Sequence, residues 1–121
     1  MTEDSNLNIS EMLKFSMDLW EKHKDEWAPM EPEKGKNFIL YMIEEIGEVI
    51  AVIKKKGEDE IMNNPAVRDH FVEELCDVMM YYMDTLNRFK VSPEEFSKAY
   101  VKKFEHNMKR DYTKQYKEMP Q

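Results

Sequence analysis

Residues 33–56 read EKGKNFILYMIEEIGEVIAVIKKK, and their apolar positions recur with the period of an α-helix. One stripe, spaced by three or four residues, consists of Ile39, Ile43, Ile46, Ile50 and Ile53. Further Tyr, Met and Val residues flank this stripe, so the segment is apolar almost all round. Because such a helix needs cover on more than one side, the segment predicts a central helix ending before Gly57 and favours an assembly of several chains.

Helix start and stop signals on either side of this segment predict three more helices. Pro29 ends the first pattern, Asn64 and Pro65 read as an N-cap and first helical residue, and Ser92 opens a capping box. The predicted helices are residues 10–27, 33–56, 65–89 and 93–113, with a polar connection at 58–63. We therefore expect an all-α, four-helix bundle-like chain, a single domain over residues 1–121 with polar flexible ends at 1–8 and 114–121.

Composition narrows the class of protein. The 121 residues carry 18 Lys and Arg against 25 Asp and Glu, a net charge of −7, which argues against binding to duplex nucleic acid or an anionic membrane. Three glycines and no alternating β-branched runs argue against a sandwich or barrel, and the single Cys76 excludes an internal disulfide framework. Without a membrane-length apolar run or a secretion signal, the chain is expected to be cytoplasmic.

Two acidic residues of the central segment lie on a face that is not ordinary solvated surface. Glu45 and Glu48 are three residues apart and share one side of the helix. Tyr41 lies one turn before them and Val52 one turn after them. The two acids are therefore bracketed by apolar residues.

The helix expected at 65–89 repeats this arrangement. Glu74 and Asp77 are again three residues apart, beside an apolar stripe, and Tyr81 follows one turn later on the same side. A short connection favours antiparallel packing of the two helices. Both acid pairs are then expected to face one cleft.

Such a cluster needs protons or cations. Two carboxylates ~5 Å apart repel by ~3 kcal/mol at an effective dielectric constant of ~20. The matching positions offer only oxygen ligands, so a hard cation is expected, Mg²⁺ first and Mn²⁺ next. A ferritin-like di-iron site is disfavoured because no Glu has a His three residues later.

The last predicted helix carries a cationic and amide strip. Lys103, Asn107 and Arg110 stand at i, i+4 and i+7. Alone, this strip is typical of a Lys/Arg edge on an amphipathic helix. Opposite a cation-loaded acidic cleft, it suits phosphate oxygens.

Aromatic residues of the first predicted helix leave two roles open. Trp20, His23 and Trp27 share a stripe and can either stack on a nucleobase or pack in the core. Core packing is the favoured role for both tryptophans.

In order, E-E-x-x-E at 44–48, E-x-x-D at 74–77 and K-x-x-x-N-x-x-R at 103–110 resemble the MazG-like all-α nucleoside triphosphate pyrophosphohydrolases. The resemblance covers roughly residues 10–112. It implies Mg²⁺-dependent hydrolysis of (deoxy)nucleoside triphosphates to the monophosphate and pyrophosphate, as nucleotide-pool house-cleaning. It also implies a homo-oligomer, either a dimer or a dimer of dimers.

Carried over by position, the resemblance implies individual roles. The implied metal ligands are Glu45, Glu48, Glu74 and Asp77. Glu45 also orients or deprotonates the attacking water, and Glu44 is an accessory acid. The implied substrate contacts are Tyr81, Lys103, Asn107 and Arg110. The alternative is a non-catalytic helical oligomer that binds a nucleotide or a partner protein, and base preference and metal number stay open.

Overall fold

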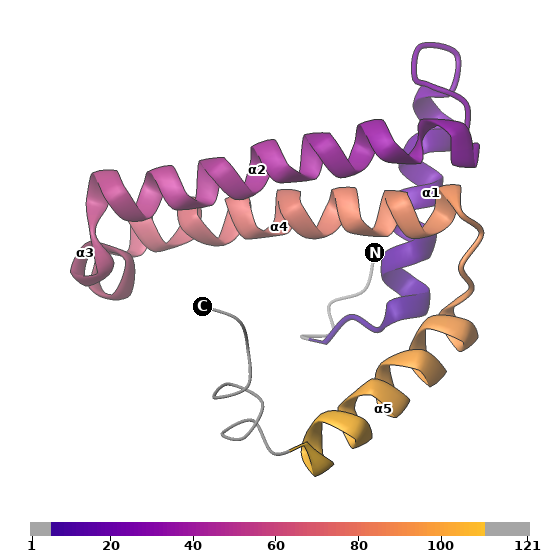
Figure 1. The fold of residues 1–121 in the computed structure, drawn as a ribbon. Helices are drawn as coiled ribbons and strands as arrows, with labels where there is room; N and C mark the ends of the chain where they lie inside the picture. Colours follow the sequence, from indigo (N-terminus) through magenta and orange to yellow (C-terminus); the bar gives the residue numbers. More distant parts are fainter. Residues whose placement is uncertain (1–5, 111–121) are drawn as a thin grey trace, which may run out of the picture. The chain divides into compact units, whose positions relative to one another are not determined.

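The computed structural model describes residues 6–110, which are all-α and contain no strand (Figure 1). The helices are α1 (Ile9–His23), α2 (Gly35–Lys56), α3 (Glu58–Asn63), α4 (Pro65–Arg88) and α5 (Pro93–Lys109), with a 3₁₀ turn, η1 (Pro32–Lys34), before α2. The predicted fold class is confirmed. The predicted flexible ends fall outside the described residues at 1–5 and 114–121.

The chain divides into two compact units, one ending at Val91 and one beginning at Ser92. The first unit holds α1 to α4, and α5 lies in the second. A four-helix bundle-like arrangement within a single domain therefore stays a prediction.

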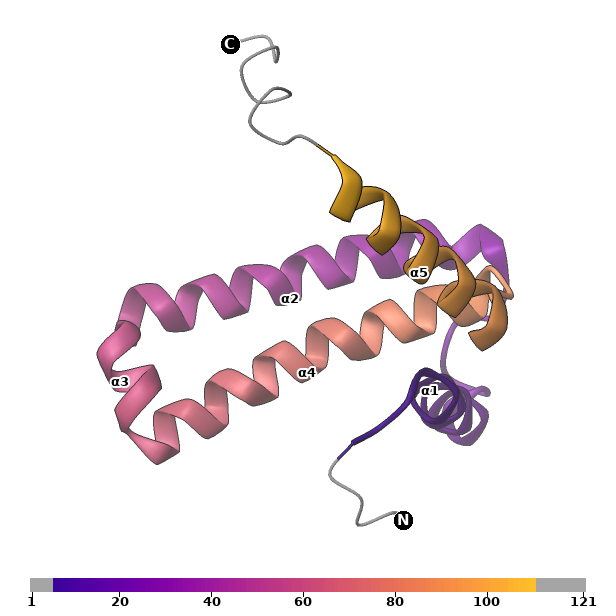
Figure 2. The same ribbon diagram turned by 90° about the horizontal axis from the view of Figure 1, so that it is seen from below.

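In the first unit, α2 and α4 run side by side as a long antiparallel pair, joined at one end by α3 (Figures 1 and 2). At the other end α1 packs against α4. Leu13 of α1 and Met83 of α4 are buried, and the Asn87 side chain donates a hydrogen bond to the Leu13 carbonyl at 3.0 Å. This contact fixes α1 to the C-terminal part of α4.

Helix α1 ends at His23, four residues earlier than the sequence pattern predicts. Backbone N–H groups of Glu26 and Trp27 turn back to the His23 carbonyl, so the chain leaves the helix in a tight turn before Pro29. The Trp20 indole N–H donates to the Ala28 carbonyl at 2.9 Å and holds this turn. Trp27 consequently lies off the helix.

The connection between α2 and α4 is helical, whereas the sequence predicts a polar connection and no helix there. Gly57 adopts a φ of +83°, which favours glycine and lets the chain reverse after α2. Ile61 then turns inward and is buried, which explains why this polar segment folds as α3. The predicted caps are confirmed, since Asn64 accepts from the Ala66 N–H and Ser92 accepts from the Glu95 N–H.

Arg88 is fully buried and joins three parts of the first unit. Its guanidinium donates to the Asp84 carboxylate on the preceding turn and to the Pro29 carbonyl in the α1–α2 connection. The same group stacks 3.6 Å from the ring centre of Phe38 on α2. Arg88 thereby ties the end of α4 to the start of α2 and to the turn that carries Trp27.

Most of the isoleucine stripe of α2 is exposed rather than covered by the other helices of the first unit. Ile43 and Ile50 are 56% and 50% exposed, and Ile39 and Ile46 are also exposed. α4 packs instead on the neighbouring face, where Val52 is buried. A second exposed stripe on α4 consists of Leu75, Met79 and Tyr82.

None of the helices within residues 6–110 combines the length and hydropathy that crossing a bilayer requires.

Candidate metal centre and adjoining pocket

Three carboxylates from two helices converge in the first unit. Glu45 comes from α2, and Glu74 and Asp77 come from adjacent turns of α4. One oxygen atom of each residue lies within 4.8 Å of the others. We call these three residues the carboxylate cluster. Antiparallel packing of α2 and α4 produces it, as the spacing of the acids predicts.

Glu48 and Glu44 lie outside the cluster. Both are exposed on α2. Their charges are still close enough to raise the pKa of the Glu45 carboxyl. Three of the four expected ligands therefore gather, and a ligand role for Glu48 stays a prediction.

Electrostatics at the cluster disfavour three negative charges together. Partial burial raises the pKa of the Glu45 carboxyl above 4.5, and the charges of Asp77 and Glu74 raise it further. The pKa of the Tyr81 hydroxyl is also raised, first by burial and then by Glu45 and Asp77. Burial is the larger cause of both shifts, and the neighbouring carboxylates add to it.

None of the ion pairs found within the first unit joins a Lys or Arg to the cluster. The Nε2 atom of His70 lies 3.7 Å from a Glu74 oxygen, and this imidazole is charged only if protonated. The donor set of the cluster is oxygen-only, and its three carboxylates concentrate negative charge. These properties fit Mg²⁺ or Mn²⁺.

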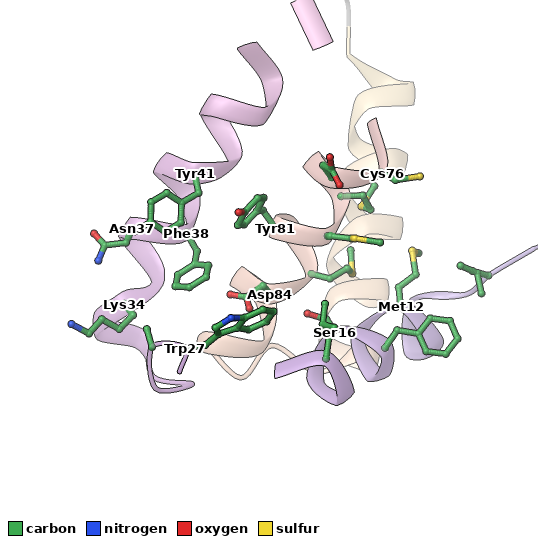
Figure 3. Close-up of a pocket in the computed structure, with 18 residues that line it drawn as sticks. Met12, Ser16, Trp27, Lys34, Asn37, Phe38, Tyr41, Cys76, Tyr81 and Asp84 are labelled. Atoms are coloured by element: carbon green, nitrogen blue, oxygen red, sulfur yellow. The ribbon is translucent and has the colours of Figure 1, made fainter. Parts of the chain in front are cut away.

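A cavity of about 890 Å³ has Asp77 of the cluster in its lining, and Figure 3 shows the side chains around this cavity. Its walls come from α1, α2, α4 and the connection before α2. Most of the lining is apolar or aromatic, and it includes Phe15, Leu19, Trp27, Phe38, Met80 and Met83. Asp77 belongs both to the carboxylate cluster and to this pocket. A ligand filling the pocket would therefore reach the acids.

An aromatic group stands where the pocket meets the cluster. The ring centres of Tyr41 and Tyr81 are 6.1 Å apart, and Phe38 lies 5.3 Å from Tyr41 and 6.3 Å from Tyr81. All three residues line the pocket. Tyr81 thus lies beside the acids, as its place one turn after Asp77 predicts.

The two tryptophans have different surroundings. Trp27 lines the pocket, is 40% exposed and stacks on His23 with a ring separation of 4.6 Å. Core packing is therefore the wrong prediction for Trp27, because α1 ends before it. Trp20 is half-buried and bonded to the backbone of the connection.

Sequence reasoning missed Arg88 and the importance of Asp84. Their spacing of four residues on one helix indicates an ion pair. Their burial depends on Pro29 and Phe38, which are distant in sequence and leave no local signal.

The expected phosphate-binding strip lies on the second unit. Lys103 is exposed on α5, and Arg110 follows the last helical residue. The Arg110 guanidinium donates to the Asn107 side-chain oxygen at 3.5 Å, so these two residues act as a pair. That the strip faces the acids stays a prediction.

The fold and the site define an all-α protein with a cluster of three carboxylates beside an aromatic pocket. Residues 33–110 match the family described as the MazG nucleotide pyrophosphohydrolase domain, and the chain belongs to this family. The resemblance noted in the sequence is thus confirmed, and membership supports nucleotide pyrophosphohydrolase activity. No match was found among curated proteins or among solved structures.

Proposed function

We propose that the protein hydrolyses (deoxy)nucleoside triphosphates to the monophosphate and pyrophosphate, using Mg²⁺ or, as a substitute, Mn²⁺. One observation carries this proposal: Asp77 is shared between the carboxylate cluster and the aromatic pocket. A nucleoside triphosphate has two parts that match these two features: a flat base that suits the aromatic pocket, and a polyphosphate that binds cations and suits the carboxylate cluster. We place this activity in cytoplasmic nucleotide-pool house-cleaning.

The proposed ligands of the cation are the carboxylate cluster together with Glu48. Divalent ions supply positive charge opposite the triphosphate and favour ionisation of a water nucleophile. Without cations the same acids would repel the substrate, because each carboxylate makes the local electrostatic potential more negative and the triphosphate is an anion.

Glu45 is the proposed base that orients or deprotonates the attacking water, and Glu44 is an accessory acid. A raised pKa supports the role of Glu45, because a carboxylate with a higher pKa is a stronger base near neutral pH. Tyr81 lies between the acids and the pocket and is positioned to contact a bound nucleotide.

The strip of Lys103, Asn107 and Arg110 is proposed to bind phosphate oxygens. A guanidinium offers a fork of donors and an ammonium offers a point charge. The bond between Arg110 and Asn107 supports this role because it orients the guanidinium.

We further propose that the active form is a homo-oligomer, a dimer or a dimer of dimers. The exposed isoleucines of α2 support this assembly, since a second chain would bury them. Leu75 and Met79 of α4 are also exposed apolar residues that a second chain could bury.

Incubation of the full chain with a panel of nucleoside and deoxynucleoside triphosphates, with Mg²⁺ or with chelator, tests the activity. Chromatography should show monophosphate and pyrophosphate only when Mg²⁺ is present. Asp77→Asn should abolish turnover, while Glu73→Gln, which makes the same charge change on an exposed residue of α4, should retain it. Release of orthophosphate alone would contradict the reaction. Nucleotide binding without turnover would favour a non-catalytic oligomer.

A further inference from the structure

One ionisable side chain stands out in the apolar lining of the pocket. Asp84 is only 8% exposed, yet it lines the cavity with Trp27 and Phe38 (Figure 3). It is not part of the carboxylate cluster and has no part in the proposed hydrolysis. Burying a carboxylate is costly unless it is paired, so the partner of Asp84 decides what it can do.

That partner is Arg88, which donates hydrogen bonds to the Asp84 carboxylate. The Arg88 Nε–H donates to one carboxylate oxygen of Asp84, and an Nη2 donor lies 3.5 Å from the other. Arg88 is itself immobilised by the Pro29 carbonyl and the ring of Phe38. A guanidinium does not lose its proton in proteins, so Arg88 keeps its donors and fixes the position of the Asp84 carboxylate.

The two oxygens of Asp84 are not equally engaged. Oδ1 accepts the close bond from Arg88, whereas Oδ2 has only the longer contact. An ionised carboxylate accepts hydrogen bonds and cannot donate them. The pocket therefore presents a fixed acceptor beside Trp27 and Phe38, in a lining that is mostly apolar or aromatic.

We infer that Asp84 is a specificity-determining residue that selects nucleobases bearing an exocyclic amino group over their oxo counterparts. This inference rests on the proposed function and deepens it. An amino group donates an N–H to Oδ2. A carbonyl oxygen in the same place would bring two hydrogen-bond acceptors into contact with no hydrogen between them, which is unfavourable. Flat rings of either kind fit the aromatic walls. The oxo bases also carry an N–H on the ring nitrogen beside the carbonyl, so the inference requires that the exocyclic group, and not this ring nitrogen, lies against Asp84.

The expected preference is about tenfold to a hundredfold, the range for hydrogen bonds to a charged group and for leaving a buried acceptor unpaired. Two matched pairs isolate the effect: dCTP against dUTP, and dATP against dITP. The measured quantity is the ratio of kcat/KM within each pair, with Mg²⁺ and the full chain. A preference of about tenfold or more for the amino member in at least one pair supports the inference, and smaller or reversed ratios in both overturn it.

Asp84→Asn supplies the second arm, because an amide both donates and accepts. It should bring the amino-to-oxo ratio to within about threefold. The matched control is Asp18→Asn, which makes the same change in an exposed pair with Lys14 on α1 and should leave the ratio unchanged. An unchanged ratio in Asp84→Asn overturns the inference.

Removing one charge leaves Arg88 buried without a counter-charge, so Asp84→Asn can fail to fold. In that case the double variant Asp84→Asn/Arg88→Gln, which removes both charges, is measured in the same way.

Binding of dCMP and dUMP to the wild-type chain, measured by calorimetry, separates this inference from the proposed function. If no triphosphate is hydrolysed, the proposed activity fails, while a tenfold tighter binding of dCMP still supports the role of Asp84. Hydrolysis without any amino preference, in rate or binding, overturns the role of Asp84 alone.

Discussion

Replacing Glu45 by Gln should stabilise the protein when divalent cations are absent. The change keeps the shape of the side chain and removes its repulsion with Glu74 and Asp77, whose oxygens lie within 4.8 Å. Each repulsion at that distance is about 1 kcal/mol in bulk water and about 3.5 kcal/mol at an effective dielectric constant of 20. Because the cluster is only partly buried, we expect the lower value for each pair. The sum of about 2 kcal/mol corresponds to a Tm increase of about 5–10 °C for a domain of this size.

Saturating Mg²⁺ should remove the stability advantage of Glu45→Gln over the wild type. A cation present at about a hundred times its Kd stabilises the folded wild type by about 2.7 kcal/mol, whereas Glu45→Gln has lost a ligand and gains much less. The variant therefore melts above the wild type in chelator and no longer does so with saturating Mg²⁺.

Thermal melts in chelator and over a Mg²⁺ titration measure both effects. Glu73→Gln is the control, since it removes an equal charge from an exposed position on α4 and should retain the full Mg²⁺ response. The electrostatic reasoning is refuted if Glu45→Gln melts at or below the wild type in chelator. A full Mg²⁺ response in Glu45→Gln would refute its role as a ligand.

Further predictions concern protons, a fourth ligand, the pocket and the assembly. Protons and Mg²⁺ compete for Glu45. Because burial and the neighbouring carboxylates raise its pKa, Mg²⁺ affinity should fall as the pH is lowered, starting at a higher pH than for an ordinary Glu, while protonation stabilises the metal-free chain; melts at several pH values with and without Mg²⁺ test this. If Glu48 completes the site, Glu48→Gln reduces the Mg²⁺-dependent rise in Tm, and an unchanged rise removes it from the ligand set. Nucleotide binding should change the fluorescence of Trp27, so Trp20→Phe keeps the response and Trp27→Phe loses it; the opposite pattern would place the base elsewhere. Ile46→Glu places a charge in the exposed stripe and should lower the molecular mass in solution by light scattering, whereas an unchanged mass would show that this stripe is not the interface.

Much of the fold follows from local signals in the sequence. Helices α2 and α4 are predictable because each combines a long apolar period with a recognisable boundary, Gly57 for α2 and Asn64 for α4. Two errors arise where tertiary contacts override local polarity. The segment forming α3 is polar except for residues such as Ile61, whose burial favours a helix. Helix α1 ends early because a backbone turn, supported by the Trp20 side chain, competes with continuation of the helix.

The candidate site was predictable in part for the same reason. Spacing within a helix places Glu74 and Asp77 together, and antiparallel packing adds Glu45. The pocket was not predictable, because its walls depend on how α1 and the connection before α2 pack on α4. The contact between Arg88 and Pro29 joins residues 59 positions apart, and no local pattern encodes it.

The double membership of Asp77 has a thermodynamic consequence. A residue that contributes to two adjoining sites makes occupancy of one depend on occupancy of the other, and this coupling is reciprocal. If a bound ion raises the affinity for the nucleotide by some factor, a bound nucleotide raises the affinity for the ion by the same factor. The occupancy of each site would then depend on both the concentration of the divalent ion and the concentration of the nucleotide.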